Sequence, residues 1–130
     1  MSKLKIEYKK HRVTTPMSFW VHKPVDSEIW SEAAVFESPM PGPVIGKGFP
    51  VYELQYRDNT LVFGSKTEID HCISVLSKKV LPTTRELAEE GGYAQYQHLH
   101  WLSKWPGDVK SWKDRQKIVK LLRALRDETI

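Results

Sequence analysis

The spacing of hydrophobic residues changes near Gly64, and this change limits the fold more than any other feature. Residues 52–56 alternate apolar and polar side chains, which is the period of a strand with one buried face. From residue 69 to 76, apolar side chains recur at intervals of three and four, which is the period of a helix. The chain therefore contains both strands and helices, with the strands first.

The strand-like part predicts a hairpin over residues 51–63 with a two-residue turn at Asp58–Asn59. In that register Tyr56 faces Leu61, and the apolar side chains of both strands share one face. Two further strands are expected earlier, over residues 4–8 and 17–22, because both stretches are rich in residues that favour strands. Residues 26–38 are ambiguous and are interpreted as a short helix leading into an extended segment.

Helix starts are marked by three capping boxes, in which a Ser or Thr precedes an acidic residue by three positions. They begin at Ser65, Thr83 and Ser111. A last helix from Ser111 carries Ile118, Leu121, Leu122 and Leu125 on one stripe. Strands in the N-terminal half and helices in the C-terminal half predict an α+β fold, with an antiparallel sheet covered on one face by helices.

Length and composition indicate one globular domain over residues 1–130. The chain is 40% hydrophobic and 28% charged, which is unlike a disordered sequence. It shows no apolar run long enough for a signal peptide or a membrane span, so no membrane partner is expected. The single cysteine, Cys72, favours a reducing compartment, and the expected location is the cytoplasm.

Positive charge is concentrated near the C-terminus. Residues 104–126 hold eight basic and two acidic side chains, a net charge of +6 in a chain whose total is +4. Helical spacing places most of the cations opposite the apolar stripe, and tryptophans stand nearby. Nucleic acids are bound by such cations together with aromatic side chains. The candidate polyanion-binding residues are Lys110, Lys113, Lys117, Lys120 and Arg123.

The preferred function is therefore a small binding module that contacts nucleic acid or an acidic protein. A small-ligand binder or enzyme with a cleft near His98 and His100 is the first alternative, and it ranks lower because no catalytic motif supports it. A protein–protein adaptor or homo-oligomer that uses exposed aromatics such as Trp20 and Trp30 is the second. No catalytic residue, metal ligand or cofactor is assigned.

The two histidines generate a prediction about metals. His98 and His100 would share one face only in a strand, and a metal site also needs a third ligand that no spacing supplies. We expect elemental analysis of the purified protein to find no stoichiometric transition metal. One metal per chain, lost on the substitution His98→Ala or His100→Ala, would contradict this interpretation.

Overall fold

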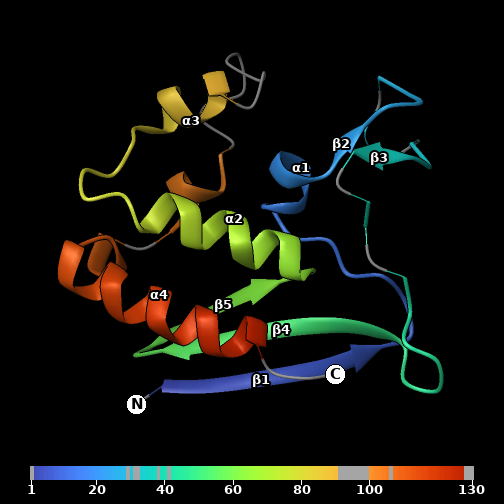
Figure 1. Ribbon diagram of the computed structural model, residues 1–130, viewed down its shortest axis with the longest axis horizontal. Coiled ribbons are helices and arrows are strands. Elements are labelled where there is room, and N and C mark those ends of the chain that lie inside the picture. The colour runs from blue at the N-terminus through green and yellow to red at the C-terminus, as the bar shows by residue number, and fades with distance from the viewer. Residues whose placement is uncertain are drawn as a thin grey trace.

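The computed structural model describes residues 2–28, 30, 33–37, 39–40, 42–90, 100–105 and 107–127. Its centre is a three-stranded antiparallel sheet in the order β1–β4–β5 (Figure 1). The strands are β1 (Ser2–Lys9), β4 (Phe49–Tyr56) and β5 (Asn59–Phe63). Helices α2 (Lys66–Leu76) and α4 (Trp112–Asp127) lie side by side on one face of this sheet. The predicted α+β class is thus confirmed.

Smaller elements surround this two-layer body. Strands β2 (Lys23–Pro24) and β3 (Phe36–Glu37) form a separate antiparallel pair. The remaining helical segments are α1 (Ser18–Val21), α3 (Thr84–Glu90) and the 3₁₀ turns Trp101–Lys104 and Gly107–Val109. Among the described residues, none of the helices combines the length and the apolar character needed to cross a membrane.

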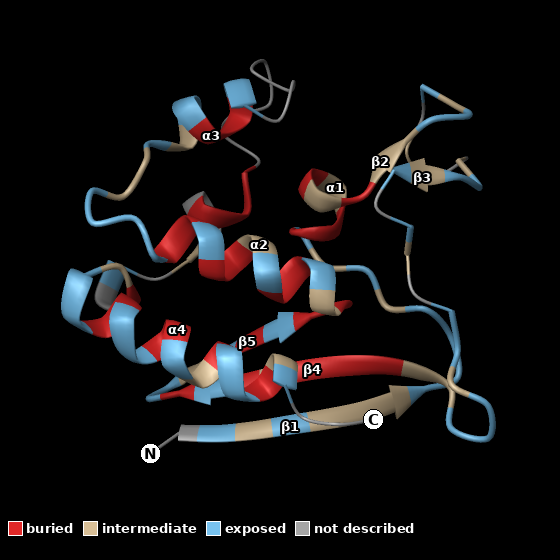
Figure 2. Cartoon of the chain, viewed as in Figure 1, coloured by how far each residue is buried: buried red, intermediate tan, exposed pale blue. Residues whose placement is uncertain are grey.

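The hydrophobic core lies between the sheet and the two long helices. Figure 2 shows the buried sides of β4, β5, α2 and α4 turned toward one another. Because the interior is tightly packed, truncating any one of its large side chains to Ala is expected to cost about 2–5 kcal/mol. Its fully buried members include Leu54, Phe63, Ile69, Leu76, Ile118, Leu122 and Leu125.

The hairpin forms as predicted, but its register differs. The turn is Arg57–Asp58, so Tyr56 pairs with Asn59 and Leu54 with Leu61. Arg57 has a φ of 55°, and its guanidinium pairs with the Asp114 carboxylate at 2.8 Å. This shift of two residues keeps every side chain on its predicted face, which is why the hydrophobic pattern alone did not reveal it.

Residues 17–22 were expected to form a strand, and that prediction is wrong. Ser18–Val21 is one helical turn, and the partner of β1 is β4. The cause is tertiary: the Ser18 hydroxyl donates to the buried Glu68 carboxylate at 2.7 Å, and Trp20 is buried in the core. Burial and a buried hydrogen bond outweigh the weak strand preference of this stretch.

The segment 26–38 is extended where it is described at its C-terminal end, in β3. Asp26 does not cap a helix; its carboxylate instead accepts hydrogen bonds from the amides of Ala34 and Val35. Ala33 and Ala34 are not helical. The other positions that suggested a helix lie partly outside the described residues.

The predicted start of α2 is confirmed and is also tied to the rest of the protein. The Ser65 hydroxyl accepts from the Glu68 amide at 3.1 Å and lies 3.0 Å from Nε2 of the buried His22. The Glu68 carboxylate accepts from the Gly64 amide, one residue before the partner expected in a capping box. It also accepts from the Thr15 hydroxyl at 2.6 Å.

Replacing Ser65 by Ala should therefore lower the free energy of unfolding by about 2 kcal/mol, through the lost cap and the lost buried contact with His22. Urea denaturation measures this change. Ser74→Ala is the matched control, since Ser74 is exposed on the same helix and Ala is a better helix former. Equal free energies of unfolding for the two variants would show that Ser65 does not stabilise α2.

The C-terminal end of α2 is held by Arg115 of α4. This side chain is only 4% exposed, and its guanidinium donates to the carbonyls of Leu76, Lys78, Lys79 and Lys110. The last carbonyls of a helix have no partner within the helix. The planar guanidinium, which carries several N–H donors, supplies hydrogen bonds at this end of α2. Arg115 thus joins the two long helices.

We expect Arg115→Ala to destabilise the protein by about 3 kcal/mol, because four backbone carbonyls, that of Leu76 buried, lose a charged donor. Arg115→Lys should recover only part of this loss, since an ammonium does not reproduce the fork. Lys113→Ala, an exposed change in the same turn, should stay within about 0.5 kcal/mol of the wild type. Thermal and urea unfolding test the ranking, and similar losses for Arg115→Ala and Lys113→Ala would refute it.

Candidate nucleic-acid interface

Helix α4 carries one exposed stripe and, next to it, one that is partly buried, because successive residues of an α-helix are turned by about 100°. The first is a ridge formed by Lys113, Lys117, Lys120 and Ala124, all exposed. The second, about 100° around the helix, contains Trp112, Gln116, Val119 and Arg123 and faces the end of α2. Figure 2 shows the outward side of α4 as mainly exposed.

The structure places the five candidate cations as follows. Lys113, Lys117, Lys120 and Arg123 are exposed on α4, and Lys110 is half-buried just before the helix. We refer to the four exposed residues as the basic face. Within the described part of the chain, no acidic side chain forms an ion pair with any of them.

The other two cations of α4 have partners within the protein, Arg115 in the interior and Arg126 at the surface. Arg115 is buried against the end of α2. Arg126 pairs with Asp70 of α2 at 2.9 Å and with its neighbour Asp127 at 3.2 Å. The sequence therefore overstates the charge available at the surface.

The hydrogen bonds and the ion pair of Asp114 are directed mainly to groups outside the basic face. Its carboxylate accepts from the hydroxyls of Ser111 and Tyr56 and pairs with Arg57. These hydrogen bonds, and to a smaller extent the charges of Arg57 and Lys117, lower the pKa of Asp114 below its usual value. The carboxylate stays ionised and committed to these partners at neutral pH.

Of the three tryptophans that precede or begin α4 in the sequence, Trp112 is the exposed one. Its side chain is 38% exposed, whereas Trp101 is buried and Trp105 is half-buried. Trp101 packs on His71 of α2, with its indole N–H donating to the imidazole at 3.1 Å. Trp20 is buried, so the expectation that it is an exposed aromatic is wrong. Trp30 is half-buried, and its indole N–H donates to the His22 carbonyl.

Two exposed lysines that the sequence analysis overlooked stand beside this region. Lys78 and Lys79 follow α2, and their carbonyls accept from Arg115, so they lie against the first turn of α4. A pair of adjacent lysines was visible in the sequence. The sequence did not show that this pair lies near α4, because that position depends on hydrogen bonds from Arg115, which follows Lys78 by 37 positions and Lys79 by 36.

The second candidate region surrounds His100, whereas His98 lies outside the described residues. His100 and His71 line a hollow of about 280 Å³ together with Trp20, Lys23, Lys78 and Glu90, among others. Burial lowers the pKa of both histidines to about 4, and the nearby Lys23 and Lys78 contribute to this for His71. Both imidazoles are therefore neutral at physiological pH.

A neutral imidazole has one acceptor nitrogen, and in both rings a protein donor already occupies it. Nε2 of His71 accepts from Trp101, and Nδ1 of His100 accepts from the Leu102 amide at 3.1 Å. A metal would have to displace these hydrogen bonds. Among the residues that the structure describes, no three His, Cys, Asp or Glu side chains are grouped to hold a metal ion.

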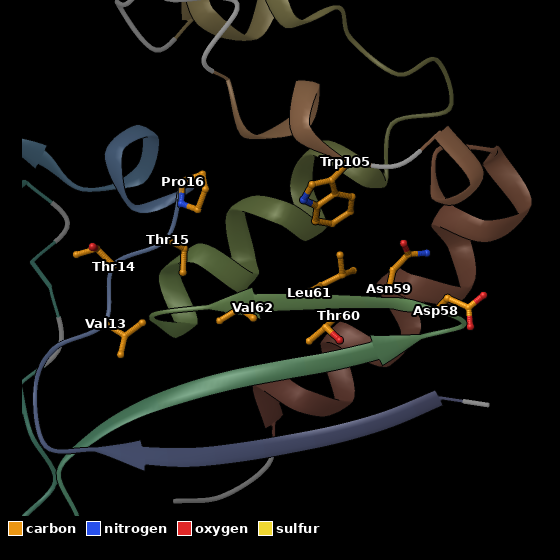
Figure 3. Close-up of a pocket in the computed structure, with 10 residues that line it drawn as sticks. All are labelled: Val13, Thr14, Thr15, Pro16, Asp58, Asn59, Thr60, Leu61, Val62 and Trp105. Atoms are coloured by element: carbon orange, nitrogen blue, oxygen red, sulfur yellow. The ribbon is translucent and has the colours of Figure 1, made fainter.

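A further hollow of about 480 Å³ runs along the edge strand β5 (Figure 3). Residues 13–16, residues 58–62 and Trp105 line it. Figure 3 shows the Trp105 ring above Leu61, on the helix side of the strand. Asp58 is the charged side chain of this lining, so the site lacks the cations that a polyanion requires.

The chain matches no protein-family model, no curated protein sequence and no solved structure. Its function is therefore argued from its own residues.

Proposed function

We propose that the protein is a small nucleic-acid-binding module that contacts phosphates through the basic face of α4. The observation that carries this proposal is the separation of charge on the helix. Arg115 and Arg126 are paired within the protein, whereas Lys113, Lys117, Lys120 and Arg123 point to solvent. The cations that the fold does not use are gathered on one side.

This arrangement is unfavourable in the free protein. Lys113 and Lys117 are four residues apart, and Lys117, Lys120 and Arg123 follow at intervals of three. Each such pair of like charges destabilises a helix by about 0.2–0.5 kcal/mol. Bound phosphates would remove the repulsion, so a polyanion complements this face better than water does.

The dimensions of the face also suit a nucleic acid. Arg123 lies ten positions after Lys113, which is about 15 Å along the helix axis. Duplex DNA carries one negative charge for about every 1.7 Å of its axis, so several phosphates lie within reach of the four cations. Buried residues on the opposite side of α4, including Ile118 and Leu122, hold the helix rigidly on the sheet.

The alternatives have weaker support. The hollow at His71 and His100 holds two neutral imidazoles with occupied acceptor nitrogens, which does not favour acid–base catalysis near pH 7. An acidic protein partner would use the same basic face. Competition between an oligonucleotide and polyglutamate distinguishes that partner from a nucleic acid.

Binding should depend steeply on salt, because each phosphate contact releases a counterion. Four contacts with duplex DNA correspond to a log–log slope of about −3.6, so raising NaCl from about 50 to 200 mM should weaken binding on the order of a hundredfold. Lys120→Ala should reduce the slope by about 0.9 and weaken binding to different sequences equally. Fluorescence anisotropy with labelled oligonucleotides measures both quantities.

Lys10→Ala is the matched control, since Lys10 is an exposed lysine beyond the end of β1 and its loss removes the same charge. We expect it to leave the slope unchanged. If neither DNA nor RNA binds at about 50 mM salt and 100 μM protein, the proposal is wrong. A basic face that binds polyglutamate but no oligonucleotide would indicate an acidic protein partner.

A further inference from the structure

A groove of about 330 Å³ lies between the C-terminal end of α2 and the side of α4. It is lined by Leu76, Ser77, Trp112, Gln116, Val119 and Arg123. The four residues from α4 follow at i, i+4, i+7 and i+11, so they form one continuous stripe. This stripe combines an aromatic ring, an amide, an apolar floor and a guanidinium, and we call the hollow the Trp112 groove.

The indole of Trp112 is held in place. The guanidinium carbon of Arg115 lies 5.2 Å from the ring centroid, over the ring, and Arg115 is itself fixed by four backbone carbonyls. Trp112 lines the groove whereas Arg115 does not, so the indole both borders the groove and contacts a fixed guanidinium outside its lining. A rigid, partly exposed ring of this kind can stack on a planar ligand with little loss of conformational entropy.

The neighbourhood of the groove is basic. Lys113, Lys117 and Lys120 form the ridge beside it, and Arg123 closes its far end. The exposed Lys78 and Lys79 stand at the end of α2, next to the first turn of α4. A polyanion that follows the ridge therefore passes directly alongside an aromatic platform.

We infer that the Trp112 groove accepts an unpaired nucleobase, stacked on the indole, while the adjoining phosphates contact the lysine ridge. The Gln116 amide lies in the same groove and offers a donor and an acceptor to the edge of the base. A duplex keeps its bases stacked inside, so this site distinguishes single strands from duplexes. The inference rests on the proposed function and specifies the nucleic acid that it favours.

The test compares a single-stranded oligonucleotide of twelve thymidines, an abasic strand of the same length and a twelve-base-pair duplex. Stacking of one base on an aromatic side chain typically changes affinity by about 5- to 100-fold. Wild-type protein should therefore bind the thymidine strand at least fivefold more tightly than the abasic strand. Trp112→Ala should abolish this preference, and Trp112→Phe, which keeps a ring, should retain most of it.

Lys120→Ala is the comparison variant, since it should weaken binding of all three ligands by similar factors. Circular dichroism and thermal unfolding of Trp112→Ala check that α4 remains folded, and the abasic strand tests the inference on wild-type protein without any substitution. Equal affinity of wild-type protein for the thymidine and abasic strands would overturn the inference, while salt-dependent binding of both would still support the proposed function. If none of the three ligands binds, both conclusions are wrong.

Discussion

The buried carboxylate of Glu68 is the interaction on which the rest of the structure depends. It is 1% exposed and accepts from the hydroxyls of Thr15 and Ser18 and from the Gly64 amide. Each of these three partners donates to a carboxyl oxygen of Glu68, so both buried oxygens have hydrogen-bond partners within the protein. The end of β5, the start of α2 and the N-terminal turn are thereby joined at one point. Gly64 must be a glycine there, because a Cβ would lie 2.8 Å from the Val13 carbonyl oxygen.

Local signals in the sequence identified the parts of the fold that local forces decide. The hydrophobic period located β4, β5, α2 and α4, and the serine caps located the starts of both long helices. The errors occurred where distant contacts decide. Residues 18–21 form a helical turn because the Ser18 hydroxyl donates a hydrogen bond to the carboxylate of Glu68, fifty positions away. The hairpin turn begins at Arg57, one residue earlier than predicted. The Arg57 guanidinium pairs with the Asp114 carboxylate and lies over the Tyr56 ring.

At the candidate site, too, local sequence signals predicted some features, and contacts between distant residues decided others. Helical spacing was sufficient to predict that Lys113, Lys117, Lys120 and Arg123 share an exposed face. It did not reveal that Arg115 is internal, because the partners of Arg115 include backbone carbonyls of residues 76, 78 and 79, and carbonyls leave no trace in a sequence. The neighbours of the two tryptophans do differ in the sequence: the buried Trp101 is followed by the apolar Leu102, whereas the exposed Trp112 lies between Ser111 and Lys113.

The two sets of cations on α4 have different physical roles, and this difference limits what the helix can recognise. Arg115 is planar, buried and bound at fixed angles, as a structural contact requires. The lysines of the basic face are long, flexible point charges, which attract phosphates but do not read the edges of bases. In the proposed complex, selectivity therefore comes from the groups beside the lysines, above all Trp112 and Gln116, which line the Trp112 groove. An aromatic ring stacks on every base, so the selection expected of this face is for unpaired bases and not for a particular sequence.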